Sequence, residues 1–183
     1  MVITPADITR EPLEIDTSLP AGAVDYNPDV LQAGPLSLHG RAELILEHRG
    51  HKEIVEDIRL RATYAGDFTL LCARCLDPVP ERLQGEFDLL FRPADADPDT
   101  GERAISEEET EIGYYDESGL VLEDVVREQV LLSLPNRTLC TPDCKGLCQH
   151  CGTNLNVETC NCDRGPSDPR WSALAGLANR LPS

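Results

Sequence analysis

Long apolar runs and basic residues are scarce in this sequence. No stretch approaches the ~20 apolar residues that a membrane-spanning helix requires, and residues 1–16 are acidic and interrupted by prolines, unlike a signal peptide. We therefore expect a cytoplasmic protein without membrane contact. The 16 Lys and Arg residues against 33 Asp and Glu residues give a net charge of −17. So acidic a surface disfavours broad, non-specific binding to nucleic acid or to anionic lipid.

Catalytic signatures are also missing. The sequence contains no Ser/His/Asp order, no phosphate-binding loop and no paired-carboxylate context. The four histidines have no catalytic or metal-binding spacing among themselves: His39, His48, His51 and His150. These absences predict a non-catalytic protein, not an enzyme, without a small-molecule substrate. Apolar residues are nevertheless sufficient for one packed domain, since they make up 40% of the 183 residues.

The middle of the chain has the alternating pattern of β-strands. Apolar and polar residues alternate over residues 36–47, 54–64, 68–72 and 82–91, and Ala65-Gly66-Asp67 is expected to form a turn. No helical segment between these strands is long enough for a parallel crossover, so the pattern predicts an antiparallel sheet. Residues 93–111, which are rich in Pro, Asp and Glu, are expected to form a solvated loop.

One helix is expected after this loop. Leu122, Val125, Val126 and Val130 recur at spacings of three and four, and the helix must end before Pro135. The predicted fold class is therefore α+β: an antiparallel β-sheet with a covering helix and a C-terminal, cysteine-rich zinc-knuckle module. The predicted units are an irregular N-terminal lead-in (1–35), the sheet-and-helix core (36–135), the zinc-binding module (136–165) and a short amphipathic C-terminal helix (166–183).

Eight cysteines carry the strongest chemical signal. They fall into four close pairs: Cys72 and Cys75, Cys140 and Cys144, Cys148 and Cys151, and Cys160 and Cys162. Clustered cysteines in a cytosolic protein are reduced, and they bind metal more often than they form disulfides. Two pairs supply the four sulfurs of a closed structural zinc site, so eight sulfurs predict two sites. Because segment 137–165 has few apolar residues, we expect its folding to require metal.

The spacing also suggests which pairs share an ion. Residues 148–152, Cys-Gln-His-Cys-Gly, have the form of a zinc knuckle, and only eight residues separate Cys151 from Cys160. We therefore assign Cys148, Cys151, Cys160 and Cys162 to one zinc ion, and Cys72, Cys75, Cys140 and Cys144 to the other. The main alternative joins Cys72 and Cys75 to Cys148 and Cys151. Two further alternatives are an iron–sulfur cluster and a redox dithiol at Cys72 and Cys75.

Three segments carry a family resemblance. They are Cys-Ala-Arg-Cys-Leu-Asp-Pro at 72–78, Glu-Gln-Val-Leu-Leu-Ser-Leu-Pro at 128–135 and the cysteine-rich run at 140–156. Together they resemble the YceD family, bacterial and plastid proteins needed for accumulation of large-subunit ribosomal RNA. The resemblance covers roughly residues 36–178 and implies no catalytic residues. Some members lack the knuckle at 148–162 but keep ligand-type residues at the other four cysteine positions, which favours the pairing above.

The resemblance implies a non-catalytic, zinc-binding factor in large ribosomal subunit biogenesis that supports accumulation of 23S rRNA. Eight thiolates on two Zn²⁺ ions add 4 − 8 = −4, which takes the charge from −17 to −21. The expected partner is therefore a basic ribosomal protein or assembly factor. The alternatives are a zinc-containing enzyme acting on rRNA and a zinc- or redox-responsive regulator. The candidates for a local contact with 23S rRNA are Arg41, Arg49, Lys52, Arg59 and Arg61.

Overall fold

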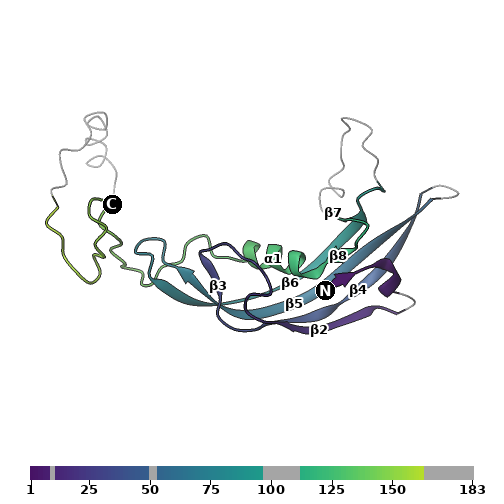
Figure 1. Cartoon of the computed structure of the whole chain (residues 1–183), viewed down its shortest axis with the longest axis horizontal. Helices are drawn as coiled ribbons and strands as arrows, with labels where there is room; N and C mark the ends of the chain where they lie inside the picture. Colours follow the sequence, from purple (N-terminus) through teal and green to yellow (C-terminus); the bar gives the residue numbers. More distant parts are fainter. Residues whose placement is uncertain (9–10, 50–52, 97–111, 163–183) are drawn as a thin grey trace, which may run out of the picture.

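The protein is built around one long, curved β-sheet. The computed structural model describes residues 1–8, 11–49, 53–96 and 112–162. Its six-stranded sheet has the order β2-β4-β5-β6-β7, with β3 pairing with β5 beside this path (Figure 1). The strands are β2 (Leu13–Leu19), β3 (Val30–Gln32), β4 (Leu36–Arg49), β5 (Glu53–Leu71), β6 (Pro78–Pro93) and β7 (Ile112–Tyr115).

A smaller pairing and one helix complete the described fold. Strand β1 (Val2–Ile3) pairs with β8 (Leu120–Val121), and a short 3₁₀ turn, η1 (Pro5–Asp7), follows β1. Helix α1 (Leu122–Leu132) begins directly after β8 and ends before Pro135, as the sequence predicts. The described chain is therefore mostly β-sheet with one helix. None of its helices has the length and apolar character needed to cross a membrane.

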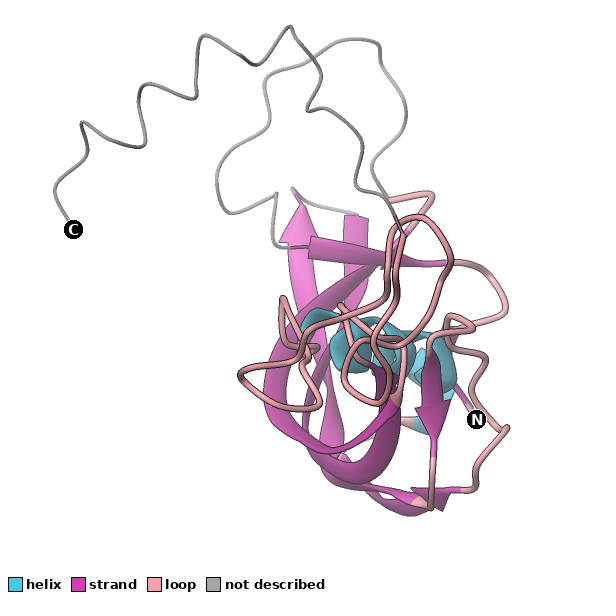
Figure 2. Cartoon of the chain, turned by 90° about the vertical axis from the view of Figure 1, so that its left-hand side faces the viewer, coloured by secondary structure: helices cyan, strands magenta, loops and turns pink. Residues whose placement is uncertain are grey.

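The apolar core lies between the sheet and α1. Alternate residues of β4, β5 and β6 point to this side, and the helix adds the apolar residues of one face. The phenolic hydroxyl of Tyr64 on β5 donates to the carbonyl oxygen of Gln129 at 3.0 Å, which links sheet and helix. Figure 2 shows the strands bending around the helix. The core residues of α1 are Leu122, Val125, Val126 and Val130.

The prediction of an irregular lead-in at 1–35 is wrong. Strands β1, β2 and β3 all lie within it, and β2 pairs with β4 over its whole length. Residues Leu13–Leu19 alternate between the core and solvent, with Ile15 and Leu19 buried. The prolines lie between the strands, where a missing backbone N–H does no harm. The segment therefore combines regular edge strands with proline-marked connections.

The predicted turn at Ala65-Gly66-Asp67 is also wrong. Strand β5 continues from Glu53 to Leu71, because residues 65–67 pair with β6 through Gln84, Leu83 and Arg82. Gly66 serves close packing instead of a turn, since a Cβ atom there would lie 2.7 Å from Leu36 Cδ1.

The sheet is antiparallel except at one edge. Strands β6 and β7 are parallel, which the expectation of a wholly antiparallel sheet missed. The connection between them, residues 94–111, contains the acidic segment. The solvated loop expected at 93–111 lies mostly outside the described residues, and so does the C-terminal helix expected at 166–183.

Candidate metal centre

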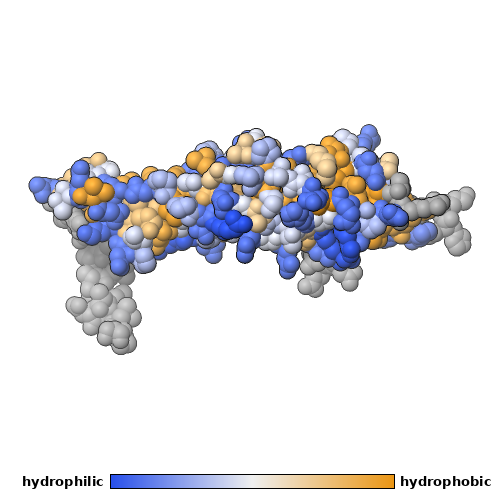
Figure 3. Space-filling view, turned by 90° about the horizontal axis from the view of Figure 1, so that it is seen from below, coloured by the Kyte–Doolittle hydropathy of each residue, from blue (hydrophilic) through white to orange (hydrophobic). Residues whose placement is uncertain are grey.

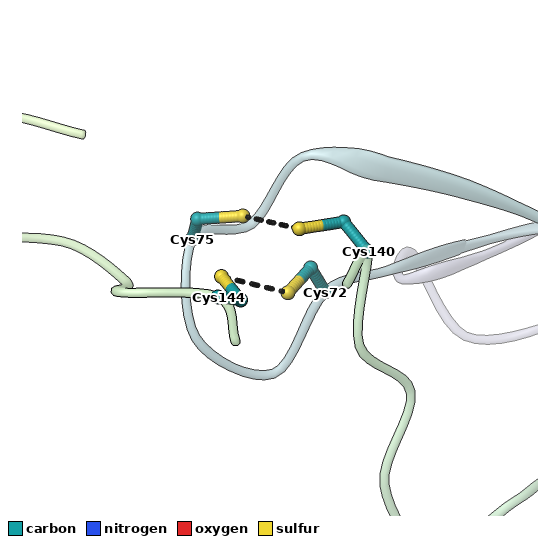
Figure 4. Close-up of side chains that lie close together, drawn as sticks. All are labelled: Cys72, Cys75, Cys140 and Cys144. Atoms are coloured by element: carbon teal, nitrogen blue, oxygen red, sulfur yellow. Dashed lines mark hydrogen bonds between the residues drawn. The ribbon is translucent and has the colours of Figure 1, made fainter. Parts of the chain in front are cut away.

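The first group of cysteines forms where the β5–β6 turn meets the segment after α1. Cys72 follows β5 and Cys75 precedes β6, while Cys140 and Cys144 come from the later segment. We call these four residues the first quartet. The sulfur atoms all lie within 4.8 Å of one another, with Cys72 Sγ 3.8 Å from Cys144 Sγ and Cys75 Sγ 3.5 Å from Cys140 Sγ (Figure 4).

The remaining cysteines form the second quartet: Cys148, Cys151, Cys160 and Cys162. Their sulfur atoms also lie within 4.8 Å of one another. The two quartets are the groups that the spacing predicts, and the alternative that joins Cys72 and Cys75 to Cys148 and Cys151 does not match the geometry. The first quartet is the more buried of the two, since three of its cysteines are buried and none of the second quartet's is.

Both quartets begin with the same kind of backbone turn. The Leu76 N–H donates to the Cys72 carbonyl oxygen at 2.9 Å, and the Gly152 N–H donates to the Cys148 carbonyl oxygen at 2.9 Å. Leu76 has φ 62° and Gly152 has φ 75°, so both occupy the left-handed region. The turn at Cys72 and Cys75 therefore has the same backbone form as the predicted knuckle at 148–152, although leucine stands where that turn has glycine. We call these two turns the first and second knuckle.

Hydrogen bonds join the segment after α1 to the first knuckle. The Ala73 N–H donates to the Thr138 carbonyl oxygen at 2.8 Å, and the Leu147 N–H donates to the Arg74 carbonyl oxygen at 3.0 Å. The Arg74 side chain donates to the Cys144 carbonyl oxygen at 2.6 Å. The segment that carries three of the four cysteine pairs is thereby attached to the end of the sheet.

Two thiols in each quartet have a lowered pKa: Cys72 and Cys144 in the first, and Cys148 and Cys151 in the second. Burial opposes the Cys72 thiolate, but the backbone N–H groups of Cys140, Cys75 and Arg74 outweigh it and bring the pKa of Cys72 to about 6. The backbone N–H groups of Cys151 and His150 lower the pKa of Cys148 to about 6. A thiolate is the form that binds a metal ion, so these two sulfurs are already close to their ligand state at neutral pH.

The size of the quartets fits a single tetrahedral ion. Four sulfurs at about 2.3 Å from a zinc ion lie about 3.8 Å from one another, close to the separations of 3.8 and 3.5 Å in the first quartet. A disulfide needs a sulfur–sulfur distance of about 2.05 Å, and all eight cysteines are free thiols. Each quartet can therefore hold a metal ion with four protein ligands and no open position.

Three arginines that we considered for an rRNA contact lie on the sheet face away from α1, in ion pairs. Arg59 donates to both carboxylate oxygens of Asp88 at 2.7 Å, and Arg61 Nε lies 3.2 Å from Asp88. Arg41 Nε lies 3.0 Å from Glu43. Figure 3, seen from this side, shows hydrophilic residues with apolar patches among them. Lys52 and the side chain of Arg49, the other two candidates, lie outside the described part of the chain.

Two asparagines and one aspartate near the quartets were given no role by the sequence. Asn156 Nδ2 donates to Cys144 Sγ at 3.3 Å, and Asn154 Nδ2 donates to Asp77 Oδ2 at 2.9 Å. Asp77 Oδ2 in turn lies 3.2 Å from Cys75 Sγ. The only sequence signal for these residues was their presence within the segments that resemble a family.

Comparison with known proteins identifies that family. The chain matches the family described as large ribosomal RNA subunit accumulation protein YceD over residues 60–178. It is 34% identical over 126 residues to an uncharacterized protein of Mycobacterium tuberculosis, covering 69% of this chain and 58% of that protein. It is 27% identical over 128 residues to the chloroplastic large ribosomal RNA subunit accumulation protein YCED homolog 1 of Zea mays, covering 57% of this chain and 44% of that protein.

The chain thus spans between 44% and 58% of the length of these two relatives. No solved structure matches it. The family match covers more than half of the chain, from the middle of β5 through both cysteine quartets. The chain belongs to the YceD family of large ribosomal RNA subunit accumulation proteins.

Proposed function

We propose that this protein is a non-catalytic, zinc-binding factor in large ribosomal subunit biogenesis that supports accumulation of 23S rRNA. The observation that carries the proposal is the pair of compact sulfur quartets within the segment that matches the YceD family. The family description supplies the link to large-subunit rRNA. The quartets supply the chemistry, because tetrahedral thiolate sites with four protein ligands are typical of structural zinc.

Zinc is the metal that the quartets favour. Four soft thiolate ligands around one small tetrahedral space suit zinc, and a closed site gives the ion no position for water or substrate. A catalytic zinc ion would need such an open position. The closed quartets therefore support a structural role for the metal and a protein that is not an enzyme. Cleavage or modification of rRNA by the purified protein would contradict this assignment.

The charge distribution favours a basic protein as the main partner. The chain has a net charge of −17, and the described arginines of the outer sheet face are already paired with carboxylates. Little unpaired positive charge is left there for phosphate groups, whereas the acidic surface attracts a basic ribosomal protein or assembly factor. Any contact with 23S rRNA is then local and secondary.

Two measurements test the proposal. Elemental analysis of the purified chain should give about two zinc ions and no iron, and serine substitution of either quartet should lower the zinc content to about one or less. Deletion of the gene should lower the ratio of 23S to 16S rRNA, and the quartet variants should restore it less well than the natural chain. A zinc-free natural chain, or normal rRNA levels after deletion, would contradict the proposal.

Affinity purification with and without ribonuclease tests the partner. We expect a basic ribosomal or assembly protein to remain bound after RNA digestion. Loss of every ribosomal partner after digestion would instead identify RNA as the main contact. Outer-face variants such as Arg59→Gln should leave the protein contact intact, because Arg59 is already paired with Asp88.

A further inference from the structure

The Asn154-Leu155-Asn156 segment connects the two quartets. It lies in the loop between Cys151 and Cys160, which the second quartet closes. Its asparagine side chains reach the first quartet instead. Asn156 Nδ2 donates to Cys144 Sγ at 3.3 Å, and Asn154 Nδ2 donates to Asp77 Oδ2 at 2.9 Å. A loop that one centre closes thus supplies hydrogen bonds to the other centre.

The side-chain amide of Asn156 is held in one orientation. Its Oδ1 accepts the Lys145 N–H at 2.7 Å, while its Nδ2 also donates to Asn154 Oδ1 at 2.9 Å. The Lys145 N–H belongs to the residue directly after Cys144. Both ends of the Asn156 amide therefore contact the Cys144 segment or Asn154, and a reversed amide would lose these bonds.

Asn154 contacts the residue that completes the first knuckle. The Asp77 carbonyl oxygen accepts the Cys72 N–H at 2.9 Å, and the Asp77 carboxylate lies 3.2 Å from Cys75 Sγ. The Asn154 amide donates to this same carboxylate. In the structure this carboxylate accepts from the Cys75 thiol, and once that thiol ionises the Asn154 amide offsets part of the carboxylate's negative charge beside the sulfur. Asn156 donates directly to another ligand sulfur, Cys144 Sγ.

Such outer contacts affect metal binding strongly. An N–H group that donates to a metal-bound sulfur stabilises its negative charge and fixes its position, and loss of an outer-shell contact typically lowers metal affinity by about 10- to 100-fold. The contacts here depend on the loop between Cys151 and Cys160. That loop contains no buried residue. Two backbone hydrogen bonds hold its first half, from the Cys148 N–H to the Thr153 carbonyl oxygen at 2.8 Å and from the Leu155 N–H to the Gly146 carbonyl oxygen at 2.9 Å, and a metal ion in the second quartet would fix its far end at Cys160.

We propose that Asn154 and Asn156 are positioning residues for the first metal centre, and that they make metal retention there depend on metal binding at the second centre. This inference rests on the proposed function, in which both quartets bind metal. Because coupling between two binding equilibria is reciprocal, loss of metal from the first centre also weakens binding at the second. The two knuckles then take up and lose metal as a coupled pair.

The experiment uses the full chain loaded with two ¹¹³Cd²⁺ ions, which thiolate sites accept. Each centre gives its own NMR resonance, assigned with serine variants of each quartet, and added chelator removes the metal. The key variant is Asn156→Asp. It keeps an oxygen to accept the Lys145 N–H but loses the donor to Cys144 Sγ. The matched control is Asn136→Ala, at an exposed asparagine that lies near Cys72 and Ala73 but makes no hydrogen bond to either quartet in the described chain.

We expect Asn156→Asp to lower the affinity of the first centre about 10- to 100-fold, while Asn136→Ala leaves it unchanged. Double serine substitution at Cys160 and Cys162 should lower first-centre affinity by at least about tenfold. Adding Asn156→Asp to that serine variant should then change little, because the loop is already released.

Two results would overturn the inference. One is an Asn156→Asp variant whose first centre binds metal as tightly as that of the natural chain. The other is a first-centre metal affinity that stays unchanged when the second quartet is lost. Retention of the β-sheet signal in circular dichroism verifies that each variant is folded. If the natural chain binds no metal at all, the proposed function fails as well. Two bound metal ions without coupling refute only the present inference.

Discussion

Each knuckle should bind metal more tightly when glycine, instead of alanine, stands directly after its second cysteine. Leu76 has φ 62° and Gly152 has φ 75°, a region that costs an L-residue about 1–2 kcal/mol. Alanine recovers roughly 0.5–1 kcal/mol relative to glycine because its unfolded chain has less conformational entropy to lose. The net preference for glycine is about 1 kcal/mol, or about fivefold in metal affinity.

The two positions test this preference from opposite directions. Leu76→Ala and Leu76→Gly both remove a side chain that is 57% exposed, so they lose similar packing, and only glycine relieves the backbone. First-centre affinity should therefore be about fivefold higher in Leu76→Gly than in Leu76→Ala. Gly152→Ala should lower second-centre affinity about fivefold, and a Cβ atom there meets nothing within 4 Å. The cost at position 152 is thus purely conformational.

The assay is competition for zinc between the full chain and a chromophoric chelator. Ala73→Gly is the control within the first knuckle, because Leu76 is the only non-glycine residue with positive φ in the described chain. At position 73 we expect glycine to weaken metal binding about two- to fivefold relative to alanine, because glycine loses more conformational entropy on folding. The reasoning is refuted if Leu76→Ala binds zinc as tightly as Leu76→Gly, or if Ala73→Gly strengthens binding as much as glycine does at position 76.

Three further predictions concern metal removal, the core and pH. Chelation should abolish amide-exchange protection over residues 138–158 but not in the central strands, which hold the apolar core, as hydrogen-exchange mass spectrometry can measure. Asp57→Ala should lower the free energy of unfolding in urea by about 3 kcal/mol, because it removes one carboxylate from the buried Arg92, which keeps Glu47. Replacing Asp57 and Arg92 together by Leu and Met should recover most of this lost free energy. No recovery would count against the ion-pair argument. A neighbouring arginine lowers the pKa of Asp88, so its stabilisation is present at neutral pH and is lost as the pH falls through the folded-state value. Asp88→Asn should therefore flatten the acid side of the thermal stability curve, and an unchanged slope would argue that this pair does not contribute.

The cysteine quartets could be predicted because their geometry is mostly local. Two cysteines within one turn cannot lie far apart, and the short loop from Cys151 to Cys160 brings the last pair back to the knuckle. Those constraints leave the first two pairs to meet each other, as they do in the structure. The long separation between Cys75 and Cys140 was no obstacle, since closing a long loop adds little entropy cost for each added residue.

Features that depend on neighbouring strands could not be predicted. Ala65-Gly66-Asp67 has turn composition, but pairing with β6 keeps it extended, and Gly66 is needed because Leu36 packs against it. In β2, the alternation is short and enclosed by prolines, so the irregular pattern around it dominated the sequence signal. Strand pairing overrides local preference in both cases.

The first knuckle shows the same limit at the scale of one residue. Gly152 marks a left-handed turn in the sequence, whereas Leu76 gives no such sign. The hydrogen bond from the Leu76 N–H to the Cys72 carbonyl oxygen imposes this turn, although leucine disfavours positive φ. The contacts of Asn154 were equally hidden, because they depend on how two distant segments lie together.

The place of the quartets in the fold indicates what their metal ions would do for a partner. The cysteine-rich segment lies at one end of the long sheet, away from β7 and the N-terminus (Figure 1). It is attached there through the first knuckle, while β6 and α1 are held independently by the apolar core. Loss of metal would therefore free the segment without unfolding the sheet. A partner that contacts only the sheet would bind equally well with and without metal. A partner that contacts both the sheet and the cysteine-rich segment would need the metal to hold the two in a fixed relative position.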